Sequence, residues 1–304
     1  MWREDIFKAC LCKWDEGKLF LDGYQRIPGG WMNIHAAHCE KGNETWQGSV
    51  FQGRTRNPFS TTSVETEILT TKLSKFLNNY AVPKDAFVMD AGCADGRITH
   101  ILLEAGMQCI VSADLNQESV HRLVNSLSQV QKERVLTIVD DFSDLPIADQ
   151  TMDVVVASAL FAEMPDFTVA LHSAMRILKR GGLLFYFDPL LEHGLIYALV
   201  RQDIEEFERI ARTSTRARMW NQKDRRYRLY YAHELEKHLL KHPALKILEK
   251  DGISILPSLI FGGILQDKNA GIQKKKELRE MILNLSQNGP QIYRQIIYIC
   301  RREE

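Results

Sequence analysis

The stretch best suited to chemistry is a turn of small residues between two apolar runs. The run 86–89 is short enough for a buried parallel strand, and Asp90, Gly92, Ala94 and Gly96 follow it. The amphipathic run that comes next predicts a helix. The first N–H groups of a helix lack partners and the helix dipole is positive there, so small residues would let a ligand approach the backbone. The spacing differs from the G-x-G-x-x-G of a dinucleotide site, and short glycine patterns also occur in plain strand–helix turns.

An acid two positions before the first glycine makes this turn resemble motif I of class I S-adenosylmethionine (AdoMet) methyltransferases, D/E-x-G-x-G-x-G, with alanine at the middle glycine. Three further matches follow in the family's order. A second predicted strand ends in Asp114, 139–147 resembles the family's G-D-A-x-x-L-P-F segment, and 176–182 resembles its R-x-L-K-P-G-G turn into a fifth strand. The four matches together are more specific than any one of them. The resemblance covers mainly residues 84–188.

The resemblance implies S-adenosyl-L-methionine as cofactor and S-adenosyl-L-homocysteine as product. The turn would hold the amino-acid tail and ribose, Asp114 would accept the ribose hydroxyls, and Asp141 would accept the adenine amino group with Phe142 against the ring. The expected cofactor-binding residues are Asp90, Gly92, Ala94, Gly96, Asp114, Leu115, Asp141, Phe142 and Ser158.

Alternating strand and helix patterns predict the fold. Repeated β–α units indicate an α/β, Rossmann-like doubly wound sheet that binds its ligand at the carboxyl ends of the strands. The resemblance implies seven strands ending in an antiparallel C-terminal hairpin. We expect an N-terminal cap over 1–60 and an AdoMet-binding domain over 61–304, which contains a helical lid insertion over 188–230 after strand five. Strands are expected at 86–91, 108–114, 134–139, 152–157, 183–187, 244–256 and 291–300, and helices at 62–80, 95–104, 117–128, 232–241 and 272–286, with one more from residue 166.

The first 60 residues are rich in Trp, His and Cys. A zinc site could be drawn from Cys10, Cys12, His35 or His38, and Cys39. Zinc cysteines usually come in C-x₂₋₄-C pairs, which this segment lacks. We therefore expect no metal, and a partly helical cap whose aromatic residues pack over the cofactor cleft.

Methyl transfer mainly requires an aligned acceptor, and it needs a general base only when the acceptor keeps a proton. Glu163, in the loop after the fourth strand, and His193, after the fifth, are the catalytic candidates, although each could be merely packed or solvated. Relatives often have a histidine in place of Glu163, so a histidine-base mechanism does not carry over.

Arg216, Arg218 and Tyr230 are the candidates for substrate binding. The segment 209–228 contains eight basic residues and one acid, and it should lie over the substrate cleft. An arginine there could hold a carboxylate or phosphate through paired hydrogen bonds. The same segment could instead be a solvated helical face that pairs with the acids just before it.

We expect AdoMet-dependent in-line methyl transfer to a small-molecule acceptor, with O-methylation favoured over N-methylation. One rival is an RNA or protein methyltransferase that uses 209–228, and another is a non-catalytic binding or scaffold protein of the same fold. The D/N-P-P-Y/F signature of methyltransferases acting on nucleic-acid amino groups is absent after the fourth strand, where the sequence reads Ser158-Ala159-Leu160-Phe161.

Composition narrows the partners. The 304 residues carry 39 Lys+Arg and 39 Asp+Glu, which makes general nucleic-acid binding unlikely as a function class. The N-terminus lacks an apolar signal region, and no run approaches the ~20 apolar residues of a spanning helix. Six scattered cysteines suit free thiols in a reducing compartment. We expect a cytoplasmic protein, and the sequence leaves its oligomeric state open.

Overall fold

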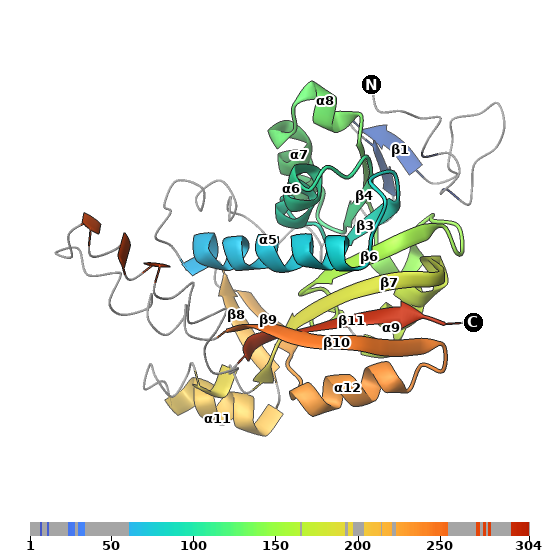
Figure 1. Cartoon of the computed structure of the whole chain (residues 1–304). Coiled ribbons are helices and arrows are strands. Elements are labelled where there is room, and N and C mark those ends of the chain that lie inside the picture. Colours follow the sequence, from blue (N-terminus) through green and yellow to red (C-terminus); the bar gives the residue numbers. More distant parts are fainter. Residues whose placement is uncertain are drawn as a thin grey trace.

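A computed structural model gives the arrangement of the chain (Figure 1). It describes residues 7, 11, 24–27, 30–33, 61–164, 166–191, 194–196, 204–213, 215–220, 223–254, 272–273, 276–277, 279–280 and 293–303. No helix in these ranges is long and apolar enough to cross a membrane.

The centre of the molecule is a doubly wound α/β sheet, as the sequence predicts. Five strands are parallel: β3 (Phe87–Ala91), β4 (Cys109–Asp114), β5 (Val135–Val139), β6 (Met152–Ser158) and β7 (Leu178–Pro189). Their order is β5-β4-β3-β6-β7, so the chain winds outward in both directions from β3. The strands consist almost entirely of buried apolar residues, as expected for a parallel sheet covered on both faces.

The expected C-terminal hairpin is confirmed. Strand β11 (Tyr293–Arg302) lies antiparallel between β7 and β10 (Leu245–Ser254) and pairs with both. The described sheet therefore contains all seven strands that the resemblance implies. Strand β7 begins at Leu178, directly after the preceding helix, and is longer than the predicted 183–187.

The expected count of seven strands is wrong for the described part of the sheet, which has nine. Strands β1 (Tyr24–Ile27) and β2 (Gly30–Asn33) form a hairpin within the segment expected to be a partly helical cap, and β2 pairs in parallel with β5. The hairpin joins the sheet because its apolar residues are buried there, with Trp31 only 1% exposed.

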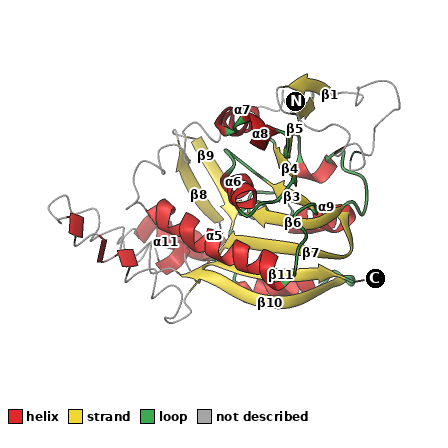
Figure 2. Ribbon diagram, turned by 45° about the horizontal axis from the view of Figure 1, so that its top comes forward, coloured by secondary structure: helices red, strands yellow, loops and turns green. Residues whose placement is uncertain are grey.

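Helices cover both faces of the sheet (Figure 2). One face packs residues of α5 (Thr61–Asn79), α6 (Arg97–Glu104) and α7 (Gln117–Ser126). The other face packs residues of α9 (Phe167–Ile177) and α12 (Ala232–Leu240). Two short helices, α8 (Gln129–Lys132) and the 3₁₀ turn η2 (Phe142–Asp144), flank β5.

The insertion after β7 is only partly helical, which corrects the predicted helical lid. It contains α11 (Ile204–Thr213), followed by an antiparallel pair, β8 (Thr215–Trp220) and β9 (Lys223–Arg228). The two strands are separated by two residues, a spacing typical of a tight hairpin. Figure 1 shows α11 and this pair at the end of the sheet opposite the C-terminus. Because β11 runs antiparallel to β7, that end is where the parallel strands have their carboxyl ends.

Candidate functional site

The turn after β3 adopts the conformation that its small residues permit. Gly92, Ala94 and Gly96 have φ angles of 71°, 48° and 94°. The N–H groups of Gly92 and Cys93 both donate to the carbonyl of Ala113 at 2.9 Å. The turn therefore wraps around the end of β4 before α6 begins, and this brings it beside Asp114.

Asp114, the last residue of β4, is fixed by the turn. Its two carboxylate oxygens accept one backbone N–H each, from Ala94 and from Asn116, both at 2.8 Å. Burial raises the pKa of Asp114 to about 6, although the two backbone hydrogen bonds lower it. Each oxygen of a carboxylate has two lone pairs, so the group retains capacity for two further donors such as ribose hydroxyls.

Asp90 lies beneath the turn and is fully buried. It accepts a 2.6 Å hydrogen bond from the hydroxyl of Thr99 on α6, which also lies 2.8 Å from the hydroxyl of Ser112. Burial raises the pKa of Asp90 to about 7. The geometry gives Asp90 a direct part in holding α6 against β3.

Two further predicted cofactor residues, Gly96 and Ser158, contact α7 and α6 respectively. A Cβ at Gly96 would lie 2.3 Å from the Leu123 side chain, so the glycine lets α7 pack closely. Ser158, at the end of β6, lies 3.4 Å from a guanidinium nitrogen of Arg97, the first residue of α6. Sequence reasoning missed Arg97, which follows the last glycine of the turn directly.

The predicted adenine segment is a 3₁₀ turn. Asp141 is exposed and caps the turn by accepting from the backbone N–H and the hydroxyl of Ser143, at 2.8 and 2.7 Å. Phe142 is 7% exposed, and its ring centroid is 6.4 Å from that of Phe161. Leu115, which follows Asp114, is partly exposed. Leu115 follows the carboxyl end of β4, and Asp141 and Phe142 follow that of β5, as expected.

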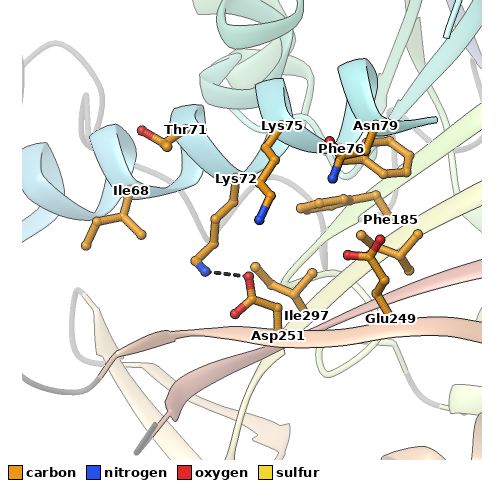
Figure 3. A pocket seen from close by; sticks show the side chains of 11 residues that line it. Ile68, Thr71, Lys72, Lys75, Phe76, Asn79, Phe185, Glu249, Asp251 and Ile297 are labelled. Carbon is orange, nitrogen blue, oxygen red and sulfur yellow. Dashed lines mark hydrogen bonds and ion pairs between the residues drawn. The ribbon is translucent and has the colours of Figure 1, made fainter. Parts of the chain in front are cut away.

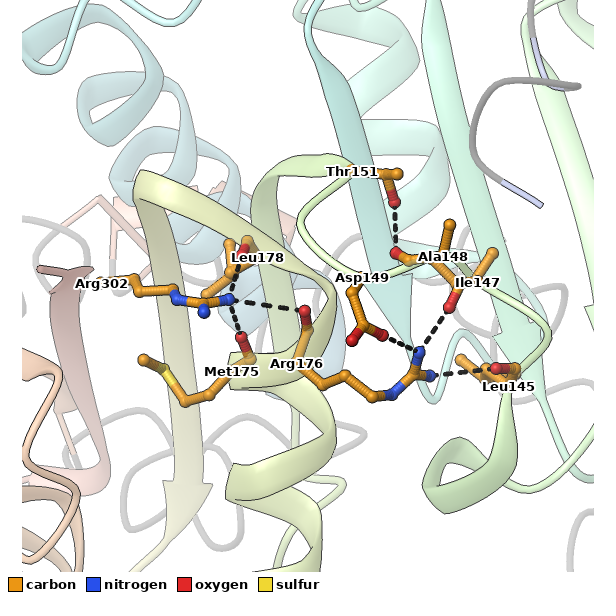
Figure 4. A network of polar contacts seen from close by, with 9 residues as sticks. All are labelled: Leu145, Ile147, Ala148, Asp149, Thr151, Met175, Arg176, Leu178 and Arg302. Atoms are coloured by element: carbon orange, nitrogen blue, oxygen red, sulfur yellow. Dashed lines mark hydrogen bonds and ion pairs between the residues drawn. The ribbon is translucent and has the colours of Figure 1, made fainter. Parts of the chain in front are cut away.

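Arg176 holds the far end of this segment (Figure 4). Its guanidinium donates to the carbonyls of Leu145 at 3.0 Å and Ile147 at 2.5 Å, and it pairs with Asp149 at 2.9 Å. Sequence reasoning used Arg176 only as part of the turn into strand five. The structure shows that it ties α9 to the segment that carries Asp141.

The loop after β6 presents an exposed carboxylate, Glu163. The loop is held by Asp188, near the end of β7, which accepts from the N–H of Ala162 at 2.9 Å and from the hydroxyl of Tyr186 at 2.8 Å. Burial, with a smaller contribution from the charge of Glu163, raises the pKa of Asp188 to about 8, although the two hydrogen bonds lower it. Glu163 also raises the pKa of Asp114, so its carboxylate acts on both sides of the site.

Asp188 is a residue that sequence reasoning missed. The signal was present, because an acid near the end of a buried apolar strand departs from the pattern of that strand. Aromatic rings pack beside it. Tyr186 lies 4.9 Å from Phe161 and 5.8 Å from Phe167, which in turn lies 5.8 Å from Tyr230. Tyr230, predicted to bind substrate, is 7% exposed.

Several predicted residues lie outside the described part of the chain. His193 is one of them, as are Cys10, Cys12, His35, His38 and Cys39. The backbones of Arg216 and Arg218 belong to β8, but their side chains are not described. Among the described residues, no group of three or more His, Cys, Asp or Glu could hold a metal ion.

Two hollows lie apart from the predicted cofactor residues. One lies between α5 and the β10–β11 pair, where Lys72 pairs with Asp251 at 2.5 Å over the apolar side chains of Phe76 and Ile297 (Figure 3). The other lies along α12 and includes Tyr230 with His238. Neither is lined by the turn, Asp114 or Asp141.

Comparison with known proteins gives the family. Residues 89–186 match a family described as a methyltransferase domain. No curated protein matches the sequence. An AdoMet-dependent methyltransferase of Methanosarcina mazei superposes with a TM-score of 0.53 at 15% identity, over 75% of this chain and 97% of that one. One from Mesorhizobium loti gives 0.51 at 13%, over 75% and 98%.

Residues 89–186 are therefore similar to a methyltransferase-domain family, and together with the fold this agrees with the class I AdoMet-dependent methyltransferases, which implies AdoMet as the cofactor. At these identities the solved structures establish the fold and not the reaction. The [4+2]-cyclase SpnF superposes with a TM-score of 0.50 at 16% identity, over 76% of this chain and 81% of that one. The same fold thus carries another chemistry, and the reaction has to be argued from the site.

Proposed function

We propose that the chain transfers the methyl group of AdoMet to a small-molecule acceptor, with an oxygen nucleophile favoured over a nitrogen one. The observation that carries this proposal is the meeting of the Gly92–Gly96 turn, Asp114 and the Asp141–Phe142 turn at the carboxyl ends of β3, β4 and β5. The donors and acceptors found there suit an amino-acid tail, a ribose and an adenine.

The residues present fit this cofactor. Gly92 has no side chain and Ala94 has only a methyl group, so the turn has little side-chain bulk, and Asp114 has unused acceptor capacity. The exposed carboxylate of Asp141 suits an adenine amino group, and Phe142, which is 7% exposed, follows it directly in sequence. When bound, AdoMet supplies a methyl group on a positively charged sulfonium.

An oxygen acceptor has to lose a proton, and the loop after β6 has an exposed carboxyl group, with another buried beneath it. Glu163 is exposed in the loop after β6, and Asp188 holds that loop from below. We assign Glu163 the role of taking the acceptor's proton and Asp188 the role of fixing its loop. The rings of Phe161 and Tyr186 are buried with their centroids 4.9 Å apart, so they support the position of this loop from within the core.

Whether Arg216 and Arg218 clamp an acidic group of the substrate stays a prediction. On the neighbouring helix α11, Arg212 pairs with Glu208 at 3.4 Å, one helical turn away. That pair supports the solvated face for part of the basic segment. We also propose a cytoplasmic location, which the buried free thiols of Cys93, Cys109 and Cys300 support.

The test adds AdoMet carrying a labelled methyl group to the purified protein together with a cell extract. The extract is then separated into small-molecule, RNA and protein fractions. We expect label in the small-molecule fraction with wild type and much less with Asp114→Ala. Label in the RNA or protein fraction would replace the small-molecule acceptor with that macromolecule, and no transfer to any fraction would favour a non-catalytic protein.

A further inference from the structure

We propose that the N-terminal hairpin is part of the adenine site, with Tyr24 and Asn33 positioning Asp140 and, through it, the Asp141–Phe142 turn. This inference rests on the proposed function, because it concerns the same cofactor. It assigns a positioning role to a segment outside the residues that match the family.

The hairpin can dock on the sheet in one close register. Strand β2 pairs in parallel with β5, with Gly30 opposite Thr137 and Met32 opposite Val139. A Cβ at Gly30 would lie 1.7 Å from the carbonyl oxygen of Thr137, so no side chain can replace this glycine without moving the strands apart. The next residue of β2, Asn33, is thereby brought level with the end of β5.

Asp140 is the junction. The residue is 2% exposed, and its Oδ1 accepts from Nδ2 of Asn33 at 2.9 Å and from the N–H of Asp141 at 2.8 Å. The hydroxyl of Tyr24 donates to Oδ2. The N–H of Asp140 donates in turn to the carbonyl of Asp114 at 3.2 Å. Asp140 therefore connects the N-terminal hairpin, the end of β4 at Asp114 and the start of the Asp141–Phe142 turn.

The bonds from the hairpin stabilise a carboxylate that burial disfavours. Burial raises the pKa of Asp140, whereas the hydrogen bonds from Tyr24, the Asp141 N–H and Asn33 lower it. Without the Tyr24 hydroxyl, the buried Oδ2 loses that donor, and without Asn33, Oδ1 keeps only the Asp141 N–H. The weaker bonding favours protonation of the group or a shift of the backbone. Either response weakens the bond to the Asp141 N–H and displaces the carboxylate that would accept the adenine amino group.

A second contact supports the same role. Leu11, 5% exposed, forms an isolated antiparallel bridge with Ile147, at the far end of the adenine segment. Ile147 is also the residue whose carbonyl Arg176 holds. The N-terminal region thus contacts the segment at both ends, while the adenine turn lies between the two contacts.

The test is titration calorimetry of the full chain with two probes. One is S-adenosylhomocysteine, and the other is S-inosylhomocysteine, in which a carbonyl oxygen replaces the adenine amino group. The variants are Tyr24→Phe and Asn33→Ala. The matched control is Tyr80→Phe, which removes a hydroxyl that donates to Glu249 at 2.7 Å, in a pair that joins α5 to β10.

We expect wild type to bind the adenine compound more tightly than the inosine compound. In both hairpin variants the dissociation constant for S-adenosylhomocysteine should rise by about tenfold, while binding of the inosine compound changes little, so that discrimination is lost. Tyr80→Phe should keep both affinities. Because Asn33→Ala leaves Tyr24 in place, it keeps the test usable if Tyr24→Phe unfolds.

A merely structural hairpin would weaken both probes by the same factor, and that result would overturn the proposal. Unchanged affinities in both hairpin variants, or no discrimination by wild type, would overturn it too while leaving the proposed function intact. If wild type bound neither probe, the proposed function would fail and the inference with it.

Discussion

The two edges of the site differ in how their buried carboxyl groups are bonded. At the cofactor edge, Asp114 and Asp140 accept hydrogen bonds on both oxygens. At the edge that we propose faces the methyl acceptor, here called the acceptor edge, Asp188 accepts both of its hydrogen bonds on Oδ2, and Oδ1 is buried without a partner in the described structure. Asp90, beneath the turn, resembles Asp188 in having one unpartnered oxygen.

Asp114 and Asp188 also differ in their protonation state at neutral pH. The pKa of Asp114 is raised to about 6, so this group is ionised at neutral pH and can accept hydroxyl donors. The pKa of Asp188 is raised to about 8 by burial, so the proton stays on at neutral pH. The cofactor edge is therefore preorganised for a fixed set of donors, whereas the acceptor edge keeps an unused polar atom close to where substrate chemistry would occur.

The largest expected effect comes from Gly92→Val. At a φ of 71° a β-branched residue is strained, and a Cβ would also lie 3.1 Å from Leu160. Relief would pull the turn away from Asp114, so we expect no measurable binding of S-adenosylhomocysteine by calorimetry. The matched control is Gly181→Val, which has a similar φ of 77° and no atom within 4 Å. It should lose stability but keep the affinity, and equal loss in both variants would show that strain alone is responsible.

Asp114→Ala should weaken AdoMet binding by about 1–3 kcal/mol, the cost of a lost charge-assisted hydrogen bond. Titration calorimetry measures it. Asp85→Ala serves as the control, because this exposed residue precedes β3 and lies at the opposite end of the strand from the site. An unchanged affinity in Asp114→Ala would remove the group from the ribose site and weaken the contrast between the two edges.

The order and type of the core elements followed from the sequence, because each β–α unit between 84 and 188 carries its own apolar periodicity. The β1–β2 and β8–β9 hairpins could not be predicted in this way. The four-residue strand β2 is fixed by packing of Trp31 and by the close approach of Gly30 to β5, which lies about a hundred residues further along the chain. For β8, arginines alternate with other residues in Thr215–Trp220, and this period of two is typical of a strand. A prediction based only on the number of charges in this segment therefore misses the strand.

Among the site residues, too, some could be predicted from the sequence and others could not. Asp114 and Asp141 could be predicted because each ends a recognisable strand in a motif. Asp188 and Asp140 could not, because their roles depend on partners in other elements, namely Ala162 in the loop after β6 and Tyr24 in the N-terminal hairpin. A motif identifies a residue by its neighbours in sequence, whereas these two are defined by neighbours in space.

Asp188→Asn should change how stability depends on pH. The folded-state pKa of about 8 lies above the ordinary value of 3.8, so the folded protein binds a proton that the unfolded chain releases between these limits. The stabilisation is therefore fully present below about pH 4 and lost as the pH rises through 8. We expect Asp188→Asn to remove a fall of about 4 kcal/mol between pH 5 and 9, measured by denaturant unfolding.

The control for this variant is Asp166→Asn. Asp166 is an exposed cap of α9 that accepts from the N–H of Thr168, and asparagine caps a helix about as well as aspartate does. This variant should keep the wild-type pH profile. If Asp188→Asn keeps it too, Asp188 is ionised in the folded protein and the two edges do not differ in protonation.

The smallest expected effect, from Glu163→Gln, tests whether the two edges are coupled. The negative charge of Glu163 raises the pKa of both Asp188 and Asp114. Its removal should lower both pKa values, so the loss of stability attributed to Asp188 should occur at lower pH than in wild type. The shift should be small, because Glu163 is exposed and solvent screens its charge.

Denaturant unfolding over a pH series measures this shift. As a control, the double variant Asp188→Asn/Glu163→Gln should have the same pH profile as Asp188→Asn alone in that range. A profile unchanged by Glu163→Gln in the wild-type background would mean that Glu163 is too far from Asp188 to affect its pKa. The loop after β6 would then not couple the two edges electrostatically.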